Sequence, residues 1–119
     1  NNEKLVKTIM SSSLTRTIAY KMVAGFAKDE LFSGVTTIRT VGGLGNFDTR
    51  LRDEIESGTK LGPRILAANQ GISVPGGHMA GSVAVAASTI PDALKQLEKG
   101  KQEKVDLIKL MITGGVLFC

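Results

Sequence analysis

The 119-residue chain has no tryptophan, one tyrosine, one histidine and a single cysteine, Cys119. One cysteine excludes an internal disulfide framework and fits a reducing compartment. Aromatic residues make up only 4% of the chain and the basic residues cluster only at 95–104, so a base-stacking surface is hard to build and we expect no nucleic-acid partner. No apolar run approaches the roughly 20 residues that a membrane-spanning helix needs, so we expect no membrane partner.

The N-terminal residues lack the basic-then-apolar order of a secretion signal, which together with the lone cysteine predicts a cytoplasmic protein. A hydrophobic content of 42% indicates a globular chain rather than a disordered one. The length suits one small domain over residues 1–119, with room for a modest core but little for an elaborate enzyme.

Lys109 is the most informative residue present. The run at 106–112, which ends in a turn at 113–115, indicates a buried strand. Alternation along a strand places Leu107, Lys109 and Met111 on one face and only apolar residues on the other. Burying an unpaired ammonium is costly, so such a lysine loses its proton, gains a strong partner or is chemically modified. Lys109 is therefore a candidate site residue; the alternative is a strand-end lysine whose head group reaches solvent.

Helical and strand patterns alternate along the chain, which predicts an α/β fold with parallel strands and right-handed crossovers. Three predicted strands make an incomplete sheet, so we expect part of a larger α/β body. The expected elements are a helix at 14–33, a strand at 35–41, a glycine-rich loop at 42–45, a short helix at 51–57 capped by Asp48 or Thr49, a strand at 63–68, a long loop at 69–82, a helix at 89–99 and the strand at 106–112, with 84–87 ambiguous.

The first predicted helix, at 14–33, has an apolar period of about 3.6 residues. Ile18, Met22, Phe26 and Ala27 follow this period, so we expect them to form the face that packs on the rest of the domain.

Several segments together resemble the metal-dependent amidohydrolase superfamily, in the branch of imidazolonepropionase-like enzymes and Xaa-Pro dipeptidases. The similarity covers about residues 15–117 and corresponds to strands two to four of that family's barrel. The matching segments are residues 34–39 followed by Gly42 and Gly43, residues 51–58 followed by 62–66, the tripeptide Gly76, Gly77 and His78, and residues 106–111 followed by Thr113, Gly114 and Gly115.

The resemblance implies a partial TIM (β/α)8 barrel from an enzyme that hydrolyses amide or peptide bonds of N-acyl amino acids or dipeptides. In such enzymes the lysine of the fourth strand, here Lys109, is carboxylated by CO2 and bridges two divalent metals, usually zinc, which activate a hydroxide. Burial favours the neutral amine that attacks CO2. The histidine of the Gly-Gly-His loop, here His78, is expected to bind the substrate's terminal carboxylate.

The chain also departs from that family's pattern. It has no His-x-His metal pair, since His78 is the only histidine, and Thr40 stands where the family often has aspartate. The remaining metal ligands and the catalytic aspartate would lie outside this sequence. We therefore expect no catalytic residue within the chain, no metal bound by the fragment alone and no activity without the rest of the enzyme.

Two further interpretations remain open. The chain could be a non-catalytic, truncated barrel that persists as an oligomer by pairing exposed strand edges, and we expect an oligomer in either case. Gly43 and Gly45 also resemble the start of a dinucleotide-binding loop, although Asp48 stands where the third glycine belongs. A tight loop that needs positive φ explains these glycines equally well.

Overall fold

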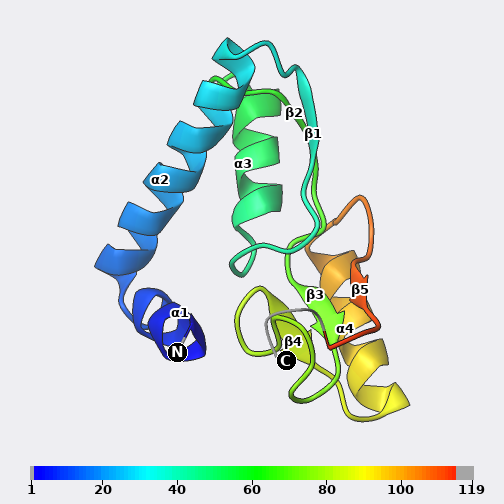
Figure 1. The fold of residues 1–119 in the computed structure, drawn as a ribbon. Coiled ribbons are helices and arrows are strands. Elements are labelled where there is room, and N and C mark those ends of the chain that lie inside the picture. The colour runs from blue at the N-terminus through cyan, green and yellow to red at the C-terminus, as the bar shows by residue number, and fades with distance from the viewer. Residues whose placement is uncertain (1, 115–119) are drawn as a thin grey trace.

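The computed structural model describes residues 2–114, with side chains from Lys4 onward, so Gly115 and Cys119 lie outside the described residues. Figure 1 shows helices α1 and α2 on one side, α3 in the middle and α4 beside the strands. The elements are α1 (Asn2–Ser11), α2 (Ser13–Phe32), β1 (Thr37–Arg39), α3 (Phe47–Glu56), β2 (Arg64–Leu66), β3 (Gly71–Ser73), β4 (Ala84–Ala86), α4 (Ile90–Gln102) and β5 (Leu110–Met111).

All strand pairs among the described residues are parallel. β1 pairs with β2, and β3 lies between β4 and β5. The extended segment 64–73 carries both β2 and β3, and it bonds to β1 on one side, where Thr40 N donates to Leu66 O at 2.9 Å. On its other side, Asp106 N donates to Ala67 O at 2.8 Å. The predicted α/β fold with parallel strands is confirmed.

Local sequence signals set the ends of two helices. The Ser12 side chain caps α2 by accepting a hydrogen bond from Leu14 N at 3.3 Å, and Gly34 beyond its last turn has a φ of 102°. At the start of α4, Thr89 and Asp92 form a reciprocal capping box. These helices match the predicted ones at 14–33 and 89–99 closely, because their caps are adjacent in sequence.

The start of α3 differs from the prediction. The helix begins at Phe47, four residues before the predicted start at Leu51, and neither Asp48 nor Thr49 is its cap. Asn46 holds the cap position without a side-chain hydrogen bond. The amide oxygen of Asn69, 20 positions away, accepts from Thr49 N at 3.0 Å instead.

Several elements escaped prediction. Residues 2–11 form α1, for which no element was predicted, and β3 lies inside the predicted loop at 69–82. The ambiguous segment 84–87 contains β4, so the described residues hold five short strands rather than three. Glycine and serine are poor strand formers, and β3 exists because β4 and β5 flank it on both sides.

The core lies between α2, α3 and β2. Tyr20, Phe47, Leu51 and Ile65 are all at most 5% exposed, and the rings of Tyr20 and Phe47 meet edge to face with centroids 5.4 Å apart. Of the α2 residues that were predicted to pack on the rest of the domain, only Ala27 is buried, so the predicted packing face is otherwise wrong.

Ile18, Met22 and Phe26 are 51%, 56% and 62% exposed. α3 packs on the Tyr20 side of α2, and no other described element covers the stripe that these residues form with Leu14. We call this stripe the α2 flank.

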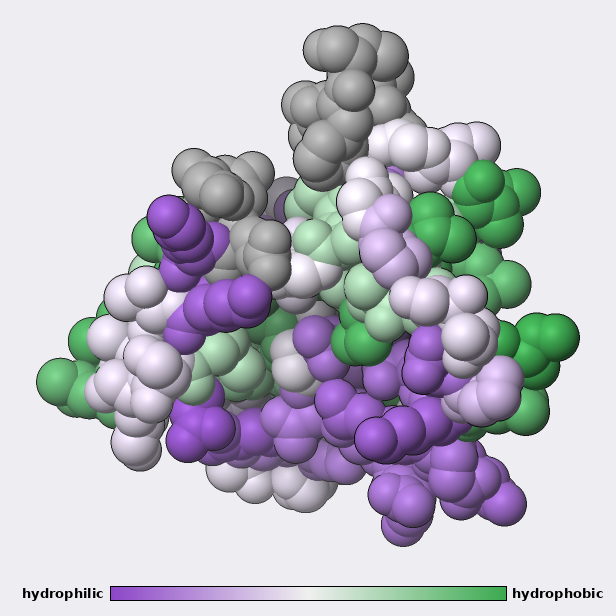
Figure 2. Space-filling model, turned by 90° about the horizontal axis from the view of Figure 1, so that it is seen from below, coloured by the Kyte–Doolittle hydropathy of each residue, from purple (hydrophilic) through white to green (hydrophobic). Residues whose placement is uncertain are grey.

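A second apolar surface lies on the far side of the molecule. It consists of Ile90 and Leu94 on α4 with Ile108, Leu110 and Ile112 around β5, all of them exposed, and we call it the β5 flank. Figure 2 shows apolar side chains at two opposite sides of the molecule with polar surface between them. Within residues 2–114, no helix is long and apolar enough to cross a membrane.

Candidate functional site

The segment around Lys109 shows the predicted alternation of burial, although only Leu110 and Met111 of the strand predicted at 106–112 form a strand, β5. Leu107, Lys109 and Met111 are partly buried, whereas Ile108 and Leu110 on the opposite face are 45% and 57% exposed. Lys109 immediately precedes β5, and its carbonyl oxygen accepts a hydrogen bond from Ile72 N at 2.9 Å. The two faces are therefore as predicted, but the apolar outer face belongs to the uncovered β5 flank instead of being buried.

The inner face around Lys109 is closely packed by neighbouring residues. Gly71 on β3 lies opposite, and a Cβ at this position would be 3.2 Å from both Lys109 Cγ and Met111 Cε. Ser73, two residues further along the same face, is 3% exposed, and its hydroxyl has no partner among the described residues. Within residues 2–114, no hydrogen bond or ion pair engages the Lys109 ammonium. The Lys109 side chain is thus partly buried, packs on Gly71, and has no polar partner among the described residues.

His78 lies in the loop that follows β3. Its ring is partly buried, and Nδ1 is buried without a hydrogen-bond partner in the described part of the chain. The preceding Gly77 packs on Ser73, since a Cβ there would be 2.6 Å from Ser73 Oγ. The loop thus lies over the end of β3, two residues beyond Gly71. No hydrogen bond or ion pair among residues 2–114 joins His78 to Lys109.

The described residues do not by themselves fit a catalytic metal site. No group of three or more His, Cys, Asp or Glu side chains within residues 2–114 is arranged to hold an ion. A catalytic zinc needs about three protein ligands, and a carboxylated Lys109 would supply one. No reaction step can therefore be assigned to these residues alone.

A polar network fixes the approach to the Lys109 strand. The Arg52 guanidinium on α3 is 2.8 Å from Asp106 Oδ2 and also donates to Lys104 O at 2.8 Å. The same Asp106 oxygen accepts from Ala67 N at 2.9 Å. The N–H of Ala67, followed by the Arg52 guanidinium, lowers the pKa of Asp106. One carboxylate thereby connects α3, the 64–73 segment and the start of the Lys109 strand.

The Asn69 side chain connects the first turn of α3 to Glu103, just beyond the end of α4. Its side-chain amide donates to Thr49 Oγ1 at 3.0 Å and to Glu103 Oε2 at 2.9 Å. Asn69 is 2% exposed and has a φ of 55°, a conformation that asparagine tolerates better than most residues. The sequence pattern gave no sign of this role, because all of its partners are distant along the chain.

Asp48 is the buried ionisable residue that the sequence interpretation missed. It lies in the first turn of α3, is 8% exposed, and its Oδ2 has no hydrogen-bond partner in residues 2–114. Burial raises the pKa of this carboxyl, and hydrogen bonding with the Thr40 hydroxyl offsets part of that rise. The only available signal was an acid directly after a glycine-rich loop, which a helix cap explains equally well.

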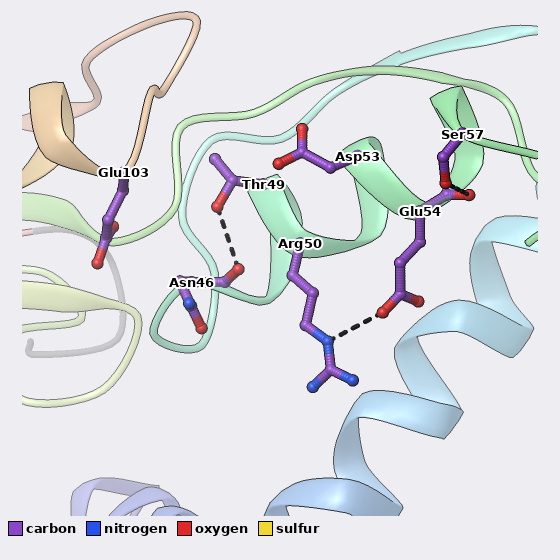
Figure 3. Close-up of a pocket in the computed structure, with 7 residues that line it drawn as sticks. All are labelled: Asn46, Thr49, Arg50, Asp53, Glu54, Ser57 and Glu103. Atoms are coloured by element: carbon purple, nitrogen blue, oxygen red, sulfur yellow. Dashed lines mark hydrogen bonds and ion pairs between the residues drawn. The ribbon is translucent and has the colours of Figure 1, made fainter. Parts of the chain in front are cut away.

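A polar groove of about 460 Å³ along α3 offers little chemistry (Figure 3). Arg50 turns toward Glu54 along the helix, with Nε 3.1 Å from Oε1, and Glu54 also accepts from the Tyr20 hydroxyl at 2.7 Å. Glu103 lies across the groove and is bonded to Asn69. The charged groups of the groove are thus engaged in ion pairs and hydrogen bonds, and no contact among the described residues joins them to Lys109.

Comparison with known proteins shows which proteins this chain resembles. No protein-family model matches the sequence, and no curated protein matches it. A Bifidobacterium longum protein assigned as a prolidase is 42% identical over 76% of this chain, with a TM-score of 0.66. The chain resembles a segment of an amidohydrolase. The predicted resemblance to the metal-dependent amidohydrolase superfamily is thus confirmed.

Two other solved structures share the fold over almost the whole chain. An amidohydrolase matches with a TM-score of 0.78 and 22% identity over 97% of this chain. A prolidase crystallised with N-methylphosphonate-L-proline matches with a TM-score of 0.78 and 21% identity over 98% of it. The chain spans 31% of each of these two proteins and 22% of the Bifidobacterium longum protein. It therefore corresponds to less than a third of each neighbour's length.

Proposed function

We propose that this chain is part of a metal-dependent amidohydrolase and forms strands two to four of a (β/α)8 barrel. Three parallel segments, at 37–43, 64–73 and 106–111, lie side by side in chain order, as neighbouring barrel strands do. A complete barrel needs about 250 residues, and the α2 and β5 flanks are the apolar surfaces that its other elements would cover.

The position of Lys109 carries the functional proposal. It combines partial burial, close packing of the side-chain stem against Gly71 and a side-chain nitrogen that no described group engages. In the complete enzyme, the neutral amine attacks the carbon of CO2 and releases one proton, which leaves an anionic carbamate. This carbamate would hold two divalent metals, which we expect to be zinc, together with ligands from outside residues 2–114. A bound metal pair supplies the Lewis acidity that activates water.

The proposed reaction is hydrolysis of the amide or peptide bond of an N-acyl amino acid or a dipeptide. The prolidase neighbour was crystallised with N-methylphosphonate-L-proline, a small ligand related to proline, which supports a substrate of this size and class. We assign His78 to the terminal carboxylate of the substrate from the family resemblance; its ring is partly buried in the loop over the end of β3, and Nδ1 has no hydrogen-bond partner among the described residues.

Replacing His78 by alanine should raise the KM of the complete enzyme for carboxylate-bearing substrates by about 10- to 100-fold, the cost of one charge-assisted hydrogen bond. The kcat should change much less, because a hydrogen bond to the carboxylate is expected to be equally strong in the substrate complex and in the transition state. Steady-state kinetics with a dipeptide and with its C-terminal amide measure the effect. Val74→Ala, at an exposed position of the same loop, is the matched control. An unchanged KM for the dipeptide would remove His78 from the site.

A non-catalytic, oligomerising role is the second candidate, and the open sheet edges favour it. β1 and β5 each pair on one side only among the described residues, and the apolar β5 flank lies around β5. Such edges invite pairing with another chain. Sedimentation of the isolated chain separates the candidates: a defined oligomer without activity supports this role, whereas a monomer that gains metal binding only with the rest of a barrel supports the first.

A further inference from the structure

The Asp48 carboxyl lies directly against the glycine-rich loop at 42–45. A Cβ on Gly43 would clash with Oδ2 and would lie only 2.7 Å from Cγ and from Oδ1. Real Cβ atoms essentially never approach other atoms so closely, so only glycine fits above this carboxyl. The loop is held from the other side as well, because Gly43 N donates to Asn69 O at 2.9 Å. Asp48 and the loop therefore form one packed unit.

The same loop touches the strand that carries Lys109. A Cβ on Gly42 would lie 3.5 Å from Met111 Cε, and that methyl group also packs on Gly71 beside the Lys109 stem. At the other end of the loop, Gly45 lies against the Met10 side chain, whose Cε would be 3.1 Å from a Cβ there. The loop that contains Gly43 thus contacts Met111 on one side and Met10 on the other.

No described charge compensates the Asp48 carboxyl. On its own helix, Arg52 gives its guanidinium to Asp53 and Asp106. Glu103, on the segment beyond Asn69, bonds to Asn69 and to Lys99. The loop itself carries no charge, and no ion pair within residues 2–114 joins Lys109 of the facing strand to Asp48. An ionised Asp48 would therefore be a buried anion with one neutral donor, the Thr40 hydroxyl.

We propose that Asp48 is a positioning residue. Its uncharged carboxylic acid packs under Gly43 and holds the glycine loop against the Lys109 strand, and its ionisation loosens that contact. The role follows from geometry because the carboxyl lies where a Cβ on Gly43 would be, while Gly42 lies against Met111. This proposal is connected with the proposed function only because Lys109 and Met111 lie on the same strand face. The role of Asp48 in packing does not depend on a bound metal.

The effect on stability has a defined sign. Because the pKa of Asp48 is raised in the folded chain, its contribution to stability is fully present below the ordinary aspartate pKa and is lost as the pH rises through the raised value. Asp48→Asn keeps the shape and removes the charge. The variant should therefore unfold at a higher temperature than the wild type near pH 7, and this advantage should vanish near pH 3.

Methyl NMR of the 119-residue chain labelled at methionine tests the proposal without metal, substrate or activity. The chain has four methionines: Met10 and Met111 contact the loop, Met22 is 56% exposed on α2, and Met79 neighbours His78 in sequence. We expect the Met10 and Met111 signals to titrate together, with a midpoint above the ordinary aspartate value of 3.8. Met22, which does not contact the loop, should not follow them.

Two variants decide the cause of the titration. In Asp48→Asn the common titration of Met10 and Met111 should disappear. In Thr40→Val the midpoint should rise, because the hydroxyl that favours the carboxylate is lost. If Asp48→Asn fails to fold, the Thr40→Val midpoint decides alone. The proposal is overturned if Met10 and Met111 do not titrate in the wild type, if their titration survives in Asp48→Asn, or if Thr40→Val leaves the midpoint unchanged.

Discussion

Replacing Lys109 by alanine should reduce kcat/KM of a complete enzyme containing this chain by roughly 1,000-fold or more, because a metal pair contributes several kcal/mol of transition-state stabilisation. The variant should also retain less metal, since the proposed carbamate is a ligand to both ions. Kinetics with a dipeptide substrate and metal analysis of the purified protein measure the two effects.

Short carboxylic acids should restore part of the activity of Lys109→Ala, because a small carboxylate can occupy the space of the carbamate. Lys95→Ala, on the exposed side of α4, is the matched control and should behave as the wild type. Full activity of Lys109→Ala without any added acid would show that Lys109 is only a strand-end lysine that reaches solvent.

Arg52→Ala should lower the free energy of unfolding of the chain by about 2–3 kcal/mol, since it leaves Asp106 and the Lys104 carbonyl without their shared donor. The side chain of Arg52 is only 9% exposed, and the 35% exposure of Asp106 keeps the expected loss at the lower end for a broken buried pair. Urea denaturation at pH 7 measures the difference. Arg16→Ala, at an exposed position of α2, is the control and should cost less than about 0.5 kcal/mol.

The Arg52 effect should also depend on pH. The N–H of Ala67 and the Arg52 guanidinium lower the pKa of Asp106, so the stability that this carboxylate contributes is present above the ordinary aspartate range. It is lost as the pH falls through the lowered value. The difference between Arg52→Ala and the wild type should therefore shrink in acid, and a difference that stays constant down to pH 2 would contradict a charge-based role.

Features that depend on neighbouring residues in the sequence were predicted well. The alternation around Lys109 follows from a seven-residue β pattern that needs no knowledge of distant partners. The ends of α2 and α4 lie close to the predicted ones because Ser12, Gly34 and Thr89 are signals next to the helix ends in the sequence.

Features that depend on distant partners were not predictable from the pattern. The buried face of α2 was misassigned because its apolar residues occupy two stripes, and only the packing of α3 on Tyr20 decides between them. The early start of α3 is set by Asn69 from across the fold. β3, with glycine and serine at two of its three positions, becomes a strand only because it is paired on both sides.

The candidate site was predicted unevenly for the same reason. Lys109 was recognisable because a charge within an apolar strand is unusual in any context. Its role as a metal ligand and the role of His78 remain predictions, since the described residues hold neither a metal cluster nor a bond between the two side chains. Asp48 was overlooked because its burial arises from the loop folding onto it, and a polar residue near a helix start ordinarily indicates a cap.

The intact mass of the protein that carries this sequence in its source cell tests the central claim most directly. The chain spans 31% of the amidohydrolase that it resembles, so the account predicts a species about three times heavier than the 12.6 kDa of these 119 residues. A species of 12.6 kDa would contradict the account, because such a chain could not complete the barrel or assemble the metal ligands that Lys109 needs.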